Sequence, residues 1–307
     1  MDIERSSDDR AAPRRTILIT GANGLLGRQV VQWFSPRHHV VAASRVDLNI
    51  ADADAVNRYV DECSPDLIIN CAALSNVDAC ESDPQAAFVA NADGPRHLAQ
   101  AAQRIGAELI HISTDYVFDG QKTIPYTIED EPRPINVYGA SKLAGEQFVR
   151  EACPRHYIVR VARLFGPGGR NFASTALETA KQHSRLLAIV DEIGSPTYVV
   201  DLAQRLEVIA QHGHYGTYHV TNRGACSWAD FATYVIELGG LSGVTIQRVR
   251  SGDLHRPARR PAYTEMRCLL SERLGFEPLR PWQQAYSEFI NSVISSTERN
   301  APAGHIT

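Results

Sequence analysis

The sequence predicts an α/β protein with a doubly wound parallel sheet and a smaller, interleaved C-terminal lobe. The first observation is that short apolar or β-branched runs alternate with helical stretches. The strand-like runs are residues 16–20, 40–43, 67–69, 108–112 and 157–161. Strands that alternate with helices form βαβ units, whose parallel sheet is covered on both faces. The second observation is a glycine-rich loop directly after the first run, at the turn where such sheets bind ligands.

Helical patterns separate these strands, starting at residue 27, covering residues 84–104 and following Tyr138. The second half of the chain is less regular. Apolar runs there cover residues 186–190 and 218–220, and helical patterns cover residues 199–211 and 227–238. Because proline and glycine are frequent between them, we expect a smaller lobe that is interleaved with the end of the first domain.

Composition and charge argue against several classes of protein. The 307 residues are 44% hydrophobic and 21% charged, as in a soluble globular protein. The net charge of −4 gives no reason to expect a nucleic-acid partner. The sequence contains no run of about 18 apolar residues, so we expect no membrane helix. The polar N-terminal segment lacks the apolar core of a secretory signal. We therefore expect a cytoplasmic protein whose six cysteines, none in a Cys-x-x-Cys pair, are reduced and structural.

The glycine loop (residues 21–27) lies between the first strand and the first helix. Glycine permits a tight turn with positive φ and lets the backbone approach a pyrophosphate, which then lies at the positive end of a helix. The G-x-x-G-x-x-G spacing differs from the G-x-G-x-x-G fingerprint, and a glycine-rich turn without a ligand is the alternative. Because the loop occupies the first βα turn, we expect it to bind a dinucleotide.

The end of the second strand indicates which nicotinamide cofactor is bound. An acidic residue there favours NAD, whereas an arginine can accept the 2′-phosphate of NADP. Arg45 stands at this position, so we expect NADPH, with NADH possible; a solvated surface charge is the alternative. Asp47 and Leu48 follow and are expected to border the adenine.

These features divide the chain into two main parts. Residues 15–165 are predicted to form a dinucleotide-binding Rossmann domain. Residues 166–294 are predicted to form mainly a substrate-binding lobe, parts of which return to the Rossmann domain. Residues 1–14 and 295–307 are expected to be disordered tails, because they carry few apolar side chains.

Tyr138 and Lys142 are candidates for proton transfer. Residues four apart share one face of a helix, and an ammonium near a phenol lowers the pKa of the phenol. Such a phenol can donate a proton to an oxygen that becomes an alkoxide. Thr114, at the end of the fourth strand, offers a hydroxyl to the same carbonyl. The alternatives are an ordinary amphipathic helix for the pair and a turn cap for the threonine.

Several segments resemble the extended short-chain dehydrogenase/reductases, and within them the dTDP-4-dehydrorhamnose reductase family. The most specific segments are residues 113–120 (STDYVFDG) and 137–146 (VYGASKLAGE). Residues 19–27 (ITGANGLLG), 70–73 (NCAA), 194–197 (GSPT), 171–172 (NF) and 260–261 (RP) also match. The resemblance covers the chain from about residue 16 to about residue 291.

The resemblance implies that NADPH reduces the 4-keto group of a dTDP-4-dehydro-6-deoxyhexose, with dTDP-4-dehydro-L-rhamnose giving dTDP-L-rhamnose as the first expectation. It implies that Tyr138 donates the proton, that Thr114 orients the carbonyl, and that Lys142 tunes Tyr138 and holds the nicotinamide ribose. The implied cofactor contacts, besides Tyr138 and Lys142, are Gly21, Asn23, Gly24, Leu25, Leu26, Gly27, Ala72, Ala73 and Asn91. The implied substrate contacts are Asp115, Tyr116, Arg163, Asn171, Phe172 and Arg260.

Two positions depart from the pattern of the family. Some relatives carry a tryptophan that packs on the sugar where this chain has Arg163, which leaves the identity of the sugar open. Some relatives dimerise through Mg²⁺ held partly by an acidic residue where this chain has Gln29. We therefore expect no bound metal, and either a monomer or a homodimer.

Two other functions remain as alternatives. A related 4,6-dehydratase would carry a second acid where this chain has Tyr116, and an epimerase would need an acid/base pair such as Cys153 and His156, which nothing places at the site. A non-catalytic NADP-binding subunit, resembling the regulatory partner of methionine adenosyltransferase, is the second alternative. The eleven histidines show no metal-binding spacing, so a metalloenzyme has little support.

Overall fold

The computed structural model describes residues 14–299, and its centre is a six-stranded sheet in the order β10-β5-β4-β3-β1-β2. Every neighbouring pair in this sheet is parallel. The strands are β1 (Thr16–Thr20), β2 (His39–Ala43), β3 (Leu67–Asn70), β4 (Glu108–Thr114), β5 (His156–Val161) and β10 (Gly216–His219). The predicted doubly wound α/β fold is confirmed.

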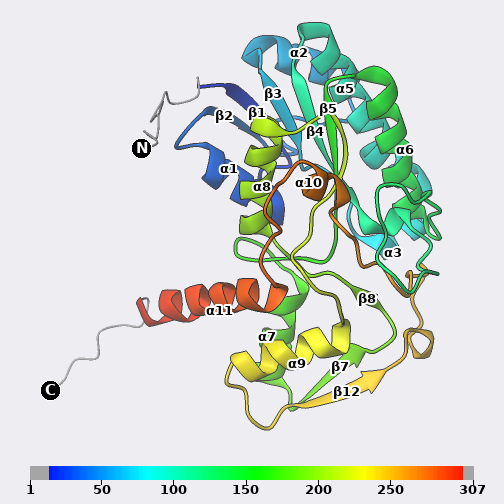
Figure 1. Ribbon diagram of the computed structural model, residues 1–307, viewed down its shortest axis with the longest axis vertical. Helices are drawn as coiled ribbons and strands as arrows, with labels where there is room; N and C mark the ends of the chain where they lie inside the picture. The colour runs from blue at the N-terminus through cyan, green and yellow to red at the C-terminus, as the bar shows by residue number, and fades with distance from the viewer. Residues whose placement is uncertain (1–13, 300–307) are drawn as a thin grey trace, which may run out of the picture.

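Helices cover both faces of the sheet (Figure 1). One face packs against α1 (Leu25–Phe34) and α8 (Val199–His212), the other against α2 (Ala53–Cys63), α5 (Gly94–Ile105) and α6 (Val137–Ala152). Successive side chains of a strand point to opposite faces. Accordingly Ile17 and Ile19 lie in the core under α1, whereas Leu18 between them lies in the core under α2. Both cores therefore need apolar residues at successive positions of the same strand.

The alanine-rich stretch predicted as one helix over residues 84–104 contains a π-helical turn. After α3 (Val77–Ser82), the chain forms α4 (Pro84–Phe88), a π-helical turn η1 (Val89–Asp93) and then α5. The buried side chain of Asn91 lies in this turn. Its amide accepts from Leu74 N at 2.8 Å and donates to the hydroxyl of Ser141 at 3.1 Å. The chain is helical throughout residues 84–105, so the predicted extent of the helix is confirmed, and these tertiary hydrogen bonds favour a π-helical turn within it that was not predicted.

The second part of the chain packs around aromatic side chains below the sheet in Figure 1. Phe165 contacts Tyr198, Phe231, Tyr286 and Phe289 at ring-centroid distances of 5.4–6.2 Å. Its helices are α7 (Phe172–Gln182), α9 (Trp228–Leu238) and α11 (Trp282–Arg299). Its short strands pair as β7 (Arg185–Ile189) with β12 (Thr245–Val249), β6 (Leu164–Phe165) with β9 (Thr197–Tyr198), and β8 (Ile193–Gly194) with β11 (Cys226–Ser227). Single turns are η2 (Asp115–Val117) and η3 (Ser251–Asp253), and α10 (Leu269–Arg273) is a short helix.

The chain crosses between its two parts more than once. After β9, α8 packs on α1 and β10 pairs with β5, so residues 199–219 return to the part of the chain that holds the six-stranded sheet. At the C-terminal end, α11 continues to Arg299, so the expected tail over residues 295–307 is helical in its first part. Residues 1–13 and 300–307, the rest of the two expected tails, lie outside the described residues. The six cysteines are free thiols, and no described helix is long and apolar enough to cross a membrane.

Candidate active site

The glycine loop brings the first and third strands into close contact. Gly21 has φ +67°, and a Cβ atom there would lie 2.6 Å from the backbone nitrogen of Ala72. A Cβ at Gly27 would lie 2.2 Å from the carbonyl oxygen of Gly21. Gly24 precedes the first turn of α1, which has no side-chain cap. The amide groups of that turn are therefore available to an anion, as a pyrophosphate site requires.

Two other predicted residues of the loop are placed differently. Asn23 is exposed, and its carbonyl accepts from Arg28 at 2.9 Å. Leu26 is buried in the core under α1, while Leu25 is half-buried beside it. The side chain of Leu26 thus stabilises the loop from beneath, and any contact it makes with a cofactor comes from its backbone.

The turn after β2 presents one free cation. Arg45 is exposed, and its side chain has no hydrogen bond or salt bridge within residues 14–299. Asp47 instead accepts from the backbone and hydroxyl of Ser44 at 2.9 and 2.6 Å, and these bonds lower the pKa of its carboxyl group. Leu48 is packed in the core under α2. Any contact that Leu48 makes with the adenine would therefore come from its backbone, and its place beside the adenine stays a prediction.

The exit of β3 lies beside the glycine loop. Asn70 accepts from the hydroxyl of Thr20 at 2.7 Å and from the backbone of Ala72 at 3.1 Å, which fixes this exit against β1. Ala73 follows and is exposed. The amide of Asn91 is already bonded to Leu74 and Ser141. It therefore supports the segment after β3 and does not offer a free group to a cofactor.

The three predicted catalytic residues come from neighbouring elements. Thr114 ends β4, and its hydroxyl donates to Asp115 Oδ1 at 3.0 Å. Tyr138 lies in the first turn of α6, with its ring edge-on to Tyr116 at 5.8 Å between centroids. Lys142, one turn later and 2% exposed, donates from Nζ to the carbonyl of Ile112 at 2.6 Å. The sheet and α6 therefore bring all three side chains toward one region.

Burial controls the pKa values in this group. It raises the pKa of Tyr138 above its ordinary value, and a hydrogen bond with Thr114 opposes the rise only in part. Burial also lowers the pKa of Lys142 to about 8, while the charge of Glu146 opposes that change. We expected Lys142 to lower the pKa of Tyr138. That expectation is wrong for the free protein, because burial dominates and the lysine binds a carbonyl of β4.

Asp115 is a buried carboxylate at the same place. Its Oδ1 accepts from Thr114, whereas Oδ2 has no hydrogen-bond partner among the described residues. Burial raises the pKa of Asp115, and the nearby hydroxyls of Thr264 and Thr114 and the charge of Arg163 oppose it. A buried acceptor without a partner is costly and is expected where a ligand supplies the missing donor.

Arg163 lies close to Asp115, and two of its five N–H donors are bonded to backbone carbonyls. It has φ +45°, and its terminal nitrogens donate to the carbonyls of Cys226 and Glu192 at 2.8 Å each. Its guanidinium also lies 4.2 Å from the ring centroid of Trp228. Arg163 thus joins the two parts of the chain beneath the candidate site.

The other predicted substrate contacts also have partners of their own. The Asn171 amide caps α7, accepts from Ser174 N at 3.2 Å and donates to the carbonyls of Gly166 and Gly169. Phe172 packs on Trp228 at 4.5 Å between centroids. These contacts position the start of α7 and leave the Asn171 amide no unpartnered atom in this structure.

Arg260 is paired with an acidic residue of α3. Both its terminal nitrogens bind the carboxylate of Asp78, at 2.6 and 2.7 Å, and this pair lowers the pKa of Asp78 to about 2. Tyr116 lies near enough for its charge state to affect Arg260. This pair holds the guanidinium in one orientation and offsets its charge, so an anionic part of a substrate would contact only its remaining N–H groups.

Two features of the site were missed by sequence reasoning. Trp228, which contacts both Arg163 and Phe172, was not selected, although tryptophan next to a serine cap was a visible signal. The buried carboxylate of Glu146 accepts from Ser113 at 2.6 Å and from Arg160 at 2.8 and 2.7 Å. Its spacing of four residues from Lys142 on α6 was the signal that could have indicated it.

Gln29, where some relatives use an acid to hold Mg²⁺, donates to the carbonyl of Pro167 at 3.5 Å. Within residues 14–299, no group of three or more His, Cys, Asp or Glu side chains is arranged to hold a metal ion.

An open helix N-terminus at the first βα turn, with a threonine, tyrosine and lysine at the ends of β4 and α6, defines a nicotinamide-dependent reductase of the short-chain dehydrogenase type. Comparison with known proteins gives the family. The family model described as the RmlD substrate binding domain matches residues 15–295. The chain belongs to the dTDP-4-dehydrorhamnose reductase family.

Three relatives illustrate this membership. The chain is 38% identical to dTDP-4-dehydrorhamnose reductase of Streptomyces griseus, over 94% of this chain and 98% of the relative. It is 36% identical to dTDP-4-keto-6-deoxy-D-glucose reductase of Streptomyces niveus, over 88% and 95%. Among solved structures, dTDP-4-dehydrorhamnose reductase of Bacillus anthracis in complex with NADP superposes with a TM-score of 0.89 at 37% identity, covering 91% of this chain and 100% of that chain.

Proposed function

We propose that this protein is an NADPH-dependent 4-ketoreductase that converts dTDP-4-dehydro-L-rhamnose to dTDP-L-rhamnose. The observation that carries the proposal is the grouping of Thr114, Tyr138 and Lys142 at the carboxyl end of the sheet, in a chain 38% identical to a named dTDP-4-dehydrorhamnose reductase. The proposal includes the cytoplasmic location expected from the sequence.

The residues present fit an NADPH molecule. The uncapped first turn of α1 and the absence of side chains at Gly21, Gly24 and Gly27 would receive the pyrophosphate. The exposed, unpaired guanidinium of Arg45 would bind the 2′-phosphate. The relative from Bacillus anthracis was solved with NADP, which supports the same cofactor here.

Each catalytic residue has a separate role in the proposed reaction. Bound NADPH supplies the hydride. The raised pKa of Tyr138 keeps its phenol protonated until the carbonyl oxygen becomes basic enough to take the proton. Thr114 hydrogen-bonds the same oxygen, and the ammonium of Lys142 holds the ribose and stabilises the phenolate that remains.

The sugar would complete the hydrogen bonds of the site. Oδ2 of Asp115, which has no partner in this structure, is placed to accept from a sugar hydroxyl. Arg260, fixed by Asp78, would bind the diphosphate. Tyr116 stands where a dehydratase would carry its second acid, so elimination is not favoured.

The test is a Tyr138→Phe variant assayed with dTDP-4-dehydro-L-rhamnose. Loss of the proton donor should lower kcat about a hundredfold to ten-thousandfold while NADPH binding, followed by fluorescence, stays near wild type. Tyr59→Phe, on α2 and outside the site, is the matched control. Near-normal turnover by Tyr138→Phe would show that the assigned mechanism is wrong.

The wild-type assay also tests the sugar. The relative from Streptomyces niveus carries a different substrate in its name at 36% identity, so dTDP-4-keto-6-deoxy-D-glucose belongs in the same assay. Faster reduction of that sugar would overturn the assignment of rhamnose. Tight NADPH binding with no turnover of either sugar would instead favour a regulatory, non-catalytic subunit.

A further inference from the structure

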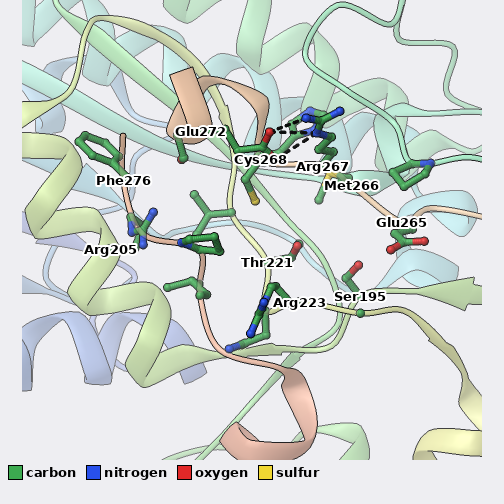
Figure 2. Close-up of a pocket in the computed structure, with 18 residues that line it drawn as sticks. Ser195, Arg205, Thr221, Arg223, Glu265, Met266, Arg267, Cys268, Glu272 and Phe276 are labelled. Atoms are coloured by element: carbon green, nitrogen blue, oxygen red, sulfur yellow. Dashed lines mark hydrogen bonds and ion pairs between the residues drawn. The ribbon is translucent and has the colours of Figure 1, made fainter. Parts of the chain in front are cut away.

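A cavity of about 220 Å³ lies at the β10 edge of the sheet (Figure 2). Its walls come from the segment after β10, from α8, from α10 and from the loop that follows α10. Within residues 14–299 its lining shares no side chain with the candidate active site. The cavity is therefore lined by residues other than those to which the proposed reaction is assigned.

Arg205 reaches this cavity from α8. It is 9% exposed and forms no salt bridge among the described residues. One terminal nitrogen donates to the backbone carbonyl of Glu277, and the guanidinium lies 5.7 Å from the ring centroid of Phe276. Burial lowers the pKa of Arg205, as expected for a cation removed from water. The charges of Cys268 and Glu277 oppose this effect, but neither group forms a salt bridge with Arg205 among the described residues. A buried arginine without a direct anionic partner is costly, so a bound anion would stabilise it.

The hydroxyl of Ser271 gives an independent indication of a missing partner. This side chain lines the same cavity, is 3% exposed, and its Oγ atom has no hydrogen-bond partner in the described structure. A hydroxyl can always rotate to suit a partner that is present, so an unpartnered buried one is uncommon. An oxyanion between Arg205 and Ser271 would satisfy both groups.

The charges of the remaining lining residues do not cancel that of Arg205. Arg267 and Glu272, joined by dashed lines in Figure 2, form a salt bridge at 2.7 Å and neutralise each other. Glu265 accepts from the hydroxyl of Tyr263 at 2.6 Å. Arg223 adds a cation whose side chain makes no hydrogen bond or salt bridge within residues 14–299. The lining thus carries three arginines and two glutamates, an excess of one positive charge, with Glu277 outside the lining but close to Arg205.

The size and the apolar wall of the cavity indicate the kind of anion. Phe276, Pro278 and Leu279 form one side of it. An apolar cavity of about 150 Å³ is enough for benzene, so a cavity of about 220 Å³ accommodates a compact carbon skeleton with one oxyanion group. We propose that this cavity binds a small organic anion, whose carboxylate or phosphate lies between Arg205 and Ser271 and whose carbon skeleton lies against Phe276 and Leu279.

The test is calorimetric titration with benzoate and with phenyl phosphate, in Tris buffer at low chloride. Saturating NADP and dTDP are added so that the candidate active site is filled. We expect saturable binding of at least one anion, and the two titrations show whether a carboxylate or a phosphate is preferred. Neutral benzamide should bind at least about tenfold more weakly, because it lacks the charge that pairs with Arg205. No binding of either anion, or equal binding of benzamide, would overturn the proposal.

Variants separate a binding role for Arg205 from a structural one. Arg205→Met should weaken anion binding about tenfold to hundredfold. It should also raise the thermal midpoint of the free protein, because an unpaired buried charge is replaced by an apolar side chain of similar length. Ser271→Ala should weaken binding with little effect on the midpoint, and Arg248→Met, at an exposed surface pair, is the control. Unchanged binding in Arg205→Met, or a lower midpoint in the free variant, would show that Arg205 only supports the fold.

Discussion

Glu146→Gln removes a negative charge from the interior of the protein. The carboxylate is fully buried and accepts from Nε and Nη2 on one edge of the Arg160 guanidinium, which is 2% exposed, at 2.8 and 2.7 Å. It also accepts from Ser113 at 2.6 Å and from Arg150 at 2.7 Å. Glutamine keeps the shape but leaves the charge of Arg160 uncompensated. Removing one partner of a buried ion pair costs about 3–5 kcal/mol.

That cost converts to a measurable change in thermal midpoint. An unfolding entropy of about 2.1 cal/mol/K per residue gives about 0.6 kcal/mol/K for 307 residues, so the midpoint should fall by about 5–8 °C. Circular dichroism in the helix band, at about 222 nm, or calorimetry measures this midpoint. Glu131→Gln, at a surface pair with Arg133, is the matched control and should change the midpoint by less than about 2 °C. The double variant Glu146→Leu/Arg160→Met should recover most of the loss, because no fully buried charge is then left unpaired and Arg150, whose side chain is 37% exposed, can be solvated. A fall of less than about 2 °C in Glu146→Gln, or a double variant less stable than the single one, would refute this reasoning.

The same substitution should change how cofactor binding depends on pH. Lys142 has a pKa of about 8, because burial lowers it and the charge of Glu146 partly opposes that effect. Its ammonium exists below this pKa, so the affinity of the wild type for NADPH should fall as the pH rises through about 8. In Glu146→Gln the fall should begin at lower pH, and in Lys142→Met it should disappear. A wild-type affinity that stays constant across this pH range would show that the lysine does not hold the cofactor through its charge.

Two further substitutions test the cofactor site. Arg45→Ala should weaken the binding of NADPH more than the binding of NADH, because only NADPH carries the 2′-phosphate. Arg58→Ala on α2 is the control. Equal losses of affinity for both cofactors would exclude this role for Arg45. Gly27→Ala should lower the free energy of unfolding by about 1–3 kcal/mol and weaken the binding of NADPH, because the new Cβ would lie 2.2 Å from the carbonyl oxygen of Gly21. Gly24→Ala, where the nearest atom would be 3.2 Å away, should cost less stability in the same denaturant titration, and a larger cost would contradict the role of close packing.

The sheet could be predicted because its strands carry a local signal. The first five strands are continuous apolar or β-branched runs, which is typical of strands covered on both faces. The sixth strand, β10, has only four residues, and it is recognised as part of this sheet by pairing with β5 far away in the sequence. The residue pattern of a short sequence segment cannot show which distant strand that segment pairs with.

The candidate site shows the same limit. Thr114, Tyr138 and Lys142 were predicted from spacing and resemblance, and α6 and β4 do bring them to one region. The partners of Arg163 and Arg260 were not predicted, because Cys226 and Asp78 lie far from them in sequence. The pKa of Tyr138 was predicted in the wrong direction, since spacing on a helix gives no measure of burial.

The return of the chain to β10 has a consequence during synthesis on the ribosome. Gly216 pairs with Tyr157, and 216 − 157 gives 59 residues that must be translated before the edge of β5 is covered. At about 5–20 residues per second, this edge stays open for about 3–12 seconds. An open strand edge can pair with another chain, so the nascent protein passes through an interval in which association is possible. Slow codons between these two strands would lengthen that interval, and fast ones would shorten it.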